Sequence, residues 1–135
     1  MIEILVVIGI IALLAAVVII AINPARQFAQ ARDSQRSSNV NAILNAYGQN
    51  LADNKGISTC AGVPVAPAIA KNIGTGGAGL VDLDACLVPT YLPAMVFDPQ
   101  GGSAADTKYT ILEEGGRITV AALNAEITTP IEVTR

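Results

Sequence analysis

The chain contains no histidine and no tryptophan, and Cys60 and Cys86 are its only cysteines among 135 residues. Histidine is the commonest acid–base group near neutral pH and a frequent metal ligand, so its absence removes the usual basis for both kinds of site. Two thiols without histidine do not complete a zinc site. No recognisable motif places two carboxylates together for catalysis. We therefore expect no enzyme activity, no metal and no cofactor.

Charge is scarce as well, with 8 Lys and Arg against 11 Asp and Glu, a net charge of −3. Residues 1–55 carry four positive and three negative charges, whereas residues 56–135 carry four positive and eight negative charges. Surfaces that bind nucleic acid depend on clustered Lys and Arg, which this acidic C-terminal part lacks. We therefore expect no specific nucleic acid partner.

One long apolar run lies near the beginning of the chain. Nineteen uncharged residues, Ile4 to Ile22, precede Asn23-Pro24, and fourteen of them are Ile, Leu or Val. A bilayer core needs about 20 apolar residues in a helix, whereas a buried strand usually has only about 4–8 residues. The run therefore predicts a helix that can span a membrane.

Glu3 is the single charged residue at the start of this run. A carboxylate at the edge of an apolar helix is costly in lipid, so such a residue is a candidate functional group. The alternative is that Glu3 only marks the end of the span that faces water.

The start of the chain resembles the N-terminal signature of the type IV pilins and the related pseudopilins, and it reads Met1-Ile2-Glu3-Ile4-Leu5-Val6-Val7-Ile8-Gly9-Ile10-Ile11-Ala12-Leu13-Leu14-Ala15. In that family a peptidase removes a short basic leader, the new N-terminal amine is methylated, and the mature chain usually opens with Phe-Thr-Leu-Ile-Glu. On this match Ile2-Glu3 corresponds to Ile-Glu and Met1 stands where the family has Leu. Two residues and the leader would then precede Met1.

The resemblance implies a structural subunit of a type IV pilus, a helical surface filament built from copies of one chain. It implies a precursor in the inner membrane, a prepilin peptidase and a pilus assembly machinery as partners, and an extracellular filament as the destination. It further implies that Glu3 pairs with the N-terminus of a neighbouring copy and selects the axial register. The filament core would be formed by the apolar residues of the helix, namely Ile4, Leu5, Val6, Val7, Ile8, Gly9, Ile10, Ile11, Leu13 and Leu14.

Two alternatives to a pilus subunit stay open. The chain could be a pseudopilin of a type II secretion-like machine, which would form a short periplasmic fibre. It could also be a membrane-tethered extracytoplasmic binding domain that never assembles, because a single span can anchor any domain.

The sequence divides into an apolar helix over residues 1–24, an amphipathic continuation over residues 25–55 and a globular head over residues 56–135. Pro24 removes a backbone donor, so we expect a kink or local unwinding between Ile20 and Pro24 that involves Asn23. Gly9 is a second weak point in the helix. Apolar residues recur at helical spacing and predict a buried face, formed by Val40, Ile43, Leu44, Tyr47 and Leu51. The polar residues of this segment are expected to be mostly solvated or to contact neighbours, and they are Arg26, Arg32, Asp33, Arg36, Asn39 and Asn41.

The end of the chain predicts a small antiparallel sheet. Residues 109–113 and 117–123 flank Glu114-Gly115-Gly116, which is a hairpin signal. Residues 126–133 alternate but contain Pro130, which makes this stretch an edge strand or splits it. We therefore expect an α+β pilin fold, in which a long N-terminal helix packs its second half on about three strands. A short helix over residues 66–71 is also expected, with Tyr91 and Phe97 as core residues.

The orientation of the chain across the membrane and the pairing of its two cysteines are linked. Arg26, Arg32 and Arg36 follow the apolar run and by the positive-inside rule place the C-terminal part in the cytoplasm. The basic leader implied by the resemblance would reverse this orientation. In a head displayed outside the cytoplasm Cys60 and Cys86 are expected to pair as a disulfide. The alternative is two separate buried thiols.

Two further patterns are weak candidates for ligand sites. Residues 74–79 satisfy G-x-G-x-x-G with Asp98 downstream, but no strand–helix context of a dinucleotide site surrounds them, so a flexible loop is favoured. Four loop acids could supply oxygen ligands to calcium, although solvated acids are the preferred interpretation; they are Asp82, Asp84, Asp98 and Asp106.

Overall fold

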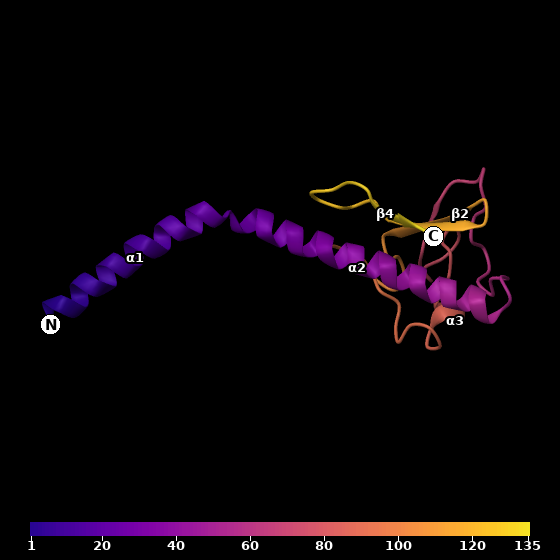
Figure 1. Ribbon diagram of the computed structural model, residues 1–135, viewed down its shortest axis with the longest axis horizontal. Coiled ribbons are helices and arrows are strands. Elements are labelled where there is room, and N and C mark those ends of the chain that lie inside the picture. Colours follow the sequence, from indigo (N-terminus) through magenta and orange to yellow (C-terminus); the bar gives the residue numbers. More distant parts are fainter.

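The computed structural model describes all 135 residues, which form a long helical stem and a small α+β head at its far end (Figure 1). This arrangement confirms the predicted fold class. The elements in chain order are α1 (Ile2–Ile22), α2 (Pro24–Asp53), β1 (Lys71–Asn72), α3 (Asp84–Leu87), β2 (Tyr109–Glu114), β3 (Arg117–Ala122) and β4 (Ile131–Thr134).

The stem bends where α1 ends and α2 begins (Figure 1). Asn23 adopts a left-handed conformation, with φ 48° and ψ 77°, and Pro24 is the first residue of α2. Asparagine tolerates this conformation better than most residues, and proline is favoured at the first helical position because its missing N–H has no partner there. The expected interruption before Pro24 is therefore confirmed, whereas Gly9 lies inside an unbroken α1.

The second half of α2 lies against the head and contributes its buried face. Val40 and Ile43 are fully buried, and Tyr47 is 1% exposed. These residues are spaced by three and four positions, which places them on one side of a helix. At its C-terminal end α2 stops at Asp53, and Gly56 follows with a φ of 85° while its N–H donates to the Leu51 carbonyl at 2.7 Å. Glycine adopts this positive φ readily and thus terminates the helix.

The sheet has four antiparallel strands in the order β1-β2-β3-β4. The hairpin β2–β3 turns at Gly115 and Gly116, both with positive φ, and pairs Glu114 with Arg117. The last strand, β4, begins immediately after Pro130 and lies at the edge of the sheet, as expected for a segment that contains proline.

The expected number of strands was too low by one, because β1 pairs with the outer edge of β2. Lys71 lies opposite Ile111, and the isolated bridge between Val65 and Glu113 extends the pairing. The prediction of a short helix over residues 66–71 is therefore wrong. The unpaired edge of β2 requires hydrogen-bond partners, and this need outweighs the weak local helix preference.

The core of the head forms between α2, the sheet and α3. Seventeen buried residues make up the cluster, and none of them belongs to α1. Tyr91 packs against this cluster as a partly buried residue, but Phe97 is 46% exposed and is not the core residue that we predicted. The neighbouring Asp98 takes the buried position instead and is 1% exposed.

Candidate functional site

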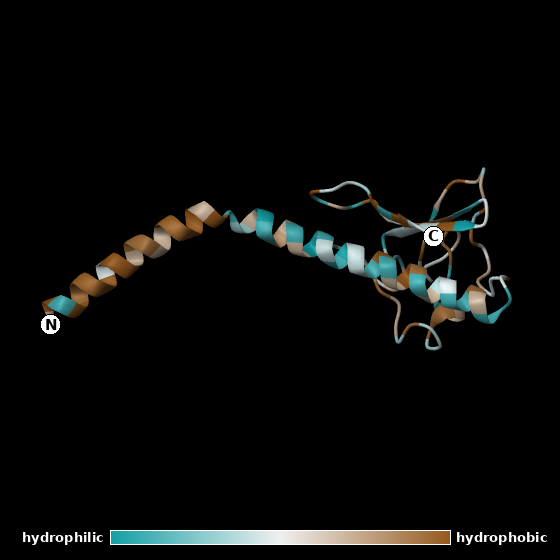
Figure 2. Ribbon diagram, in the orientation of Figure 1, coloured by the Kyte–Doolittle hydropathy of each residue, from teal (hydrophilic) through white to brown (hydrophobic).

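Helix α1 exposes a long apolar surface. It has 21 residues, none of them buried, and it is long and apolar enough to cross a membrane. Figure 2 shows hydrophobic colours around the whole helix, with a hydrophilic patch near its N-terminal end. The residues predicted to form a filament core, Ile4 to Leu14, all lie on this exposed segment. A helix that is apolar on every side needs an apolar environment on every side.

Glu3 lies in the first turn of α1 and is exposed. No salt bridge or side-chain hydrogen bond within the chain involves its carboxylate. The position is electrostatically favourable, since an acidic group near a helix N-terminus interacts well with the helix dipole. Glu3 therefore has free acceptor oxygens at the end of a helix that otherwise offers only apolar contacts.

Cys60 and Cys86 form a disulfide bond, as expected for a head outside the cytoplasm, with their Cα atoms 5.2 Å apart. The bond connects the loop after α2 to α3 and encloses 25 intervening residues. A loop of this length typically gives a stabilisation of about 2–4 kcal/mol. The expected pairing is confirmed, and the chain has no free thiol.

A buried ionic network fastens the head to α2, and the sequence did not predict it. The guanidinium group of Arg36 is fully buried and donates to both carboxylate oxygens of Asp98, at 2.7 Å from Nε and 3.0 Å from Nη2. It also donates to Asp33 at 2.8 Å, to Glu126 at 3.1 Å and to Gln100 at 3.1 Å. Hydrogen bonding to Asp98 is the main reason why the pKa of Arg36 lies above its ordinary value.

Asp33 anchors the loop between β3 and β4. Its carboxylate accepts hydrogen bonds from the backbone N–H groups of Glu126, at 3.0 Å, and Ile127, at 2.8 Å. The Glu126 carboxylate in turn accepts two hydrogen bonds from Arg32, each 2.6 Å long. The loop is thus held against α2 by charge-assisted hydrogen bonds, which are about twice as strong as neutral ones.

These contacts lower the pKa of both acids. Burial alone would raise the pKa of Asp33, but the amides of Glu126 and Ile127 and the Arg36 guanidinium outweigh it and lower the value to about 2. The hydrogen bond from Arg32, supported by Arg36, lowers the pKa of Glu126 to about 2.

The expectation that Asp33 and Arg36 are solvated was wrong, and a signal in the sequence could have corrected it. Arg36 precedes Val40 by four residues, and Ile43 follows three residues later, so all three share the buried side of α2. A charged residue on an apolar helix face predicts a buried partner. That partner is Asp98, which lies 62 residues farther along the chain, and only the fold brings it next to Arg36.

The glycine-rich segment 74–79 is a structural loop packed on residues 104–105. The N–H of Thr75 donates to the Ala104 carbonyl at 3.2 Å, and the N–H of Gly76 donates to the Ala105 carbonyl at 2.8 Å. A Cβ atom at Gly74 would lie 2.3 Å from the Ala105 carbonyl oxygen. The glycines thus permit close backbone packing, and these two amides are not free to bind a phosphate.

The four loop acids do not come together as a cation site. No group of three or more His, Cys, Asp or Glu residues is placed to hold a metal ion. Asp98 binds Arg36, while Asp106 forms a 2.5 Å salt bridge with Lys108 and Asp82 accepts a hydrogen bond from the Asp84 amide.

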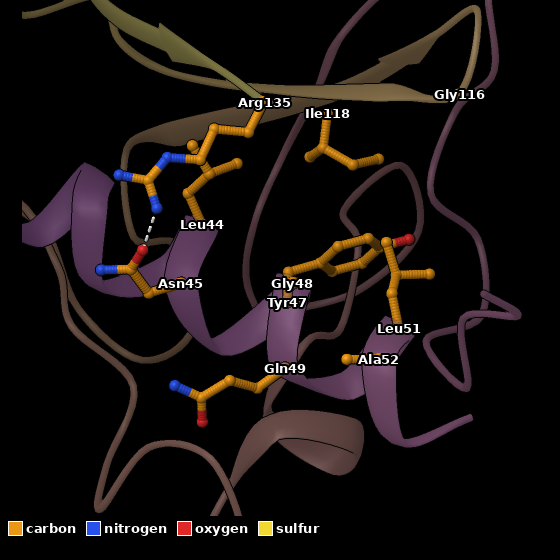
Figure 3. Close-up of a pocket in the computed structure, with 10 residues that line it drawn as sticks. All are labelled: Leu44, Asn45, Tyr47, Gly48, Gln49, Leu51, Ala52, Gly116, Ile118 and Arg135. Carbon is orange, nitrogen blue, oxygen red and sulfur yellow. Dashed lines mark hydrogen bonds between the residues drawn. The ribbon is translucent and has the colours of Figure 1, made fainter. Parts of the chain in front are cut away.

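A groove lies between α2 and the β2–β3 hairpin on the surface of the head (Figure 3). Its volume is about 500 Å³, and its apolar lining includes Leu44, Leu51 and Ile118. Gly48 and Gly116 contribute no side chains to it. Arg135 borders the groove and donates a hydrogen bond to the Asn45 side chain. The groove offers apolar contact but no pair of groups arranged for acid–base chemistry.

No family model, no curated protein and no solved structure matches this chain.

Proposed function

We propose that the chain is the structural subunit of a type IV pilus-like filament, which polymerises through α1. The observation that carries this proposal is that α1 is apolar on all sides and has no buried residue. Leaving a large aliphatic side chain in water instead of burying it costs about 1.5–3 kcal/mol of free energy. Lipid can cover such a helix before assembly, and neighbouring copies of α1 can cover it afterwards.

The exposed side of α2 supports packing between copies. Sixteen consecutive uncharged residues lie between Arg36 and Asp53, so the side of α2 that faces solvent carries no charge over this length. A surface helix usually has charged residues on that side. Small and amide side chains allow helix backbones to approach closely and to form hydrogen bonds between helices. The exposed residues of this stretch are of these types, namely Ser38, Asn45, Gly48, Gln49 and Ala52.

The head is held in a fixed position relative to α2, as a repeating unit requires. The Arg36 network and the contacts of α2 with β3 and β4 connect the stem to the sheet. A repeated, non-closing contact between such units generates a filament. The stem would then lie in the filament interior and the acidic head on its surface.

Glu3 gives this polymer a means of selecting its register. Within one copy its carboxylate has no partner, and the N-terminal amine of an adjacent copy is a suitable one. Such a pair at about 4 Å is worth up to about 4 kcal/mol at an effective dielectric constant of 20, before desolvation is subtracted. A copy added in the wrong register would leave the carboxylate unpaired in apolar surroundings.

We expect Glu3→Ala to insert into membranes normally and to abolish or strongly reduce filament growth. The measurement is electron microscopy of material sheared from cells, together with mass analysis of its main protein and membrane fractionation. Ile4→Leu, which keeps the apolar character of the next residue, is the control and should form normal filaments. Abundant regular filaments from Glu3→Ala would refute the pairing role.

The same images separate this function from its alternatives. Long surface filaments made of this chain support a pilus subunit, and short fibres confined to the periplasm indicate a pseudopilin. Recovery of monomers alone, from sheared surfaces and from membranes, would show a membrane-tethered domain and contradict the proposal.

A further inference from the structure

Phe28 is the most exposed aromatic residue of the chain and has no partner within it. Its side chain is 65% exposed in the second turn of α2, whereas Tyr47 and Tyr109 are buried in the core. Exposed single apolar residues are common, but an aromatic ring is a frequent anchor of protein interfaces. Arg26, two residues earlier, forms no salt bridge.

The groove shown in Figure 3 has the properties of a receptor for such a ring. Leu44, Leu51 and Ile118 supply an apolar lining. No atom lies within 4 Å of the position that a Cβ would take at Gly48 or at Gly116, so the space above both glycines is open.

The two features cannot meet within one chain. Gly48 lies 20 residues beyond Phe28 in the same helix, which places it about 30 Å farther along the axis and about 200° around it. The groove also lies 26 residues beyond Ile22, about 39 Å along the helix, which is farther than a lipid headgroup layer extends. Lipid is therefore not the occupant of the groove.

We propose that the N-terminal part of α2 of one copy packs on the groove of another copy that is shifted by about 30 Å along the filament axis, with Phe28 inserted between Leu44, Gly48 and Ile118. This copy is a different neighbour from the one whose N-terminus pairs with Glu3. Knob and groove lie on opposite flanks of the same helix, so a copy whose knob is bound still offers its groove, and a copy whose groove is occupied still offers its knob. A contact of this kind is heterologous and grows an open helical polymer. The inference rests on the proposed filament function and names the contact by which neighbouring stems engage outside the apolar core.

Site-specific photocrosslinking in the full chain tests this contact. Phe28 is replaced by p-benzoylphenylalanine, and filaments are assembled from an equal mixture of ¹⁵N-labelled and unlabelled chains. Trypsin cuts after Arg36, Lys55 and Arg117, so Leu44 and Gly48 lie on peptide 37–55 and Ile118 lies on peptide 118–135. We expect crosslinks from position 28 to these two peptides, with mixed isotope labels in about half of them. The same crosslinker at Phe97 is the control and should not give this pattern.

Filaments that crosslink position 28 elsewhere, or only within one chain, would overturn the Phe28 contact and leave the filament function intact. Absence of filaments from the unmodified chain would instead overturn both proposals.

Two substitutions give an independent readout. Phe28→Ala removes the knob, and Gly48→Leu fills the groove; each should reduce filament yield at least tenfold. Neither should lower the melting temperature of the detergent-solubilised chain, because Phe28 is exposed and the Gly48 position is open. Phe97→Ala, at the other exposed aromatic, is the matched control and should assemble normally. Normal filaments from both Phe28→Ala and Gly48→Leu would contradict the contact.

Discussion

Arg36 is the residue on which the attachment of the head to the stem depends. Its side chain and that of Asp98 are both 0% exposed, and each satisfies the charge of the other. No buried side-chain nitrogen or oxygen atom in the molecule lacks a hydrogen-bond partner. A network of this kind is weak evidence for high stability, but removal of one member leaves an unpaired buried charge.

We expect Arg36→Ala to lower the free energy of unfolding by about 3–5 kcal/mol, since Asp98 would remain buried without a counterion. Arg32→Ala is the matched control, because the salt bridge of Arg32 with Glu126 is about 30% exposed and its loss should destabilise the fold much less. Denaturant unfolding of both variants in detergent measures the difference. Equal effects of the two substitutions would show that burial of the Asp98 carboxylate does not determine the loss in free energy of unfolding.

The same network predicts how stability depends on pH. The pKa of Asp33 and that of Glu126 are lowered to about 2 in the folded protein, from ordinary values of 3.8 and 4.5. Groups with a lowered folded pKa contribute stability that is complete above the unfolded pKa and is lost as the pH falls through the folded one. We therefore expect the melting temperature to fall between about pH 4.5 and pH 2 through these two acids.

Melting curves of the wild type and of Asp33→Asn with Glu126→Gln, recorded from pH 2 to pH 7, isolate this contribution. The stability difference between the two proteins should be constant above pH 5 and shrink towards pH 2. A difference that does not change with pH would show that these two carboxylates keep their ordinary pKa values when folded.

Among the elements, the junction of α1 and α2 is set by two neighbouring residues with separate effects. Asn23 accepts a left-handed conformation and caps α2, with its side-chain oxygen 3.5 Å from the Arg26 amide. Pro24 cannot donate a hydrogen bond to the preceding turn. The apolar stem therefore ends at Ile22, and α2 can take a different direction from α1 (Figure 1).

Replacement of both residues, in Asn23→Ala with Pro24→Ala, should join α1 and α2 into one straighter helix. Alanine restores the missing donor and disfavours a left-handed backbone. Spin labels at Leu14→Cys and Ser38→Cys, both at exposed positions, report the change as a longer distance in pulsed electron resonance. Asn23→Gly is the control, because glycine adopts the left-handed conformation readily and should keep the shorter distance. An unchanged distance in the alanine variant would show that the bend has another cause.

On the scale of the whole molecule, α1 is separate from the core of the head. None of the residues of α1 is buried, and the core cluster uses residues from Val40 onward. The head also has its own disulfide bond and its own sheet. The apolar half of the stem therefore supplies no residue to the core of the head.

A chain that begins at Ala25 should consequently fold as a soluble monomer with the same melting temperature as the head of the full protein. The reason is that the truncation removes no core residue and keeps Asp33, Arg36 and the disulfide bond. Circular dichroism melting and size-exclusion chromatography measure this. Aggregation or a markedly lower melting temperature would show that α1 contributes to the core.

Features that depend on local patterns could be predicted from the amino-acid sequence. A continuous apolar run specifies α1 because only a helix satisfies every backbone group of such a segment in an apolar environment. Asn23-Pro24 specifies the break, Glu114 to Gly116 the hairpin turn and Pro130 the edge position of β4, because each acts through its own backbone geometry. The resemblance of the first fifteen residues supplied the filament hypothesis, which remains a proposal.

Features that depend on residues far apart in the chain could not be predicted and are set by how the chain packs. The partner of Arg36, the strand β1, the groove beside Gly48 and the exposure of Phe97 all require elements more than 20 residues apart to meet. A buried charge and an unpaired strand edge each demand a partner, but local sequence does not say which one. Packing of the sheet on α2 brings the available partners into reach, and this step assigns them.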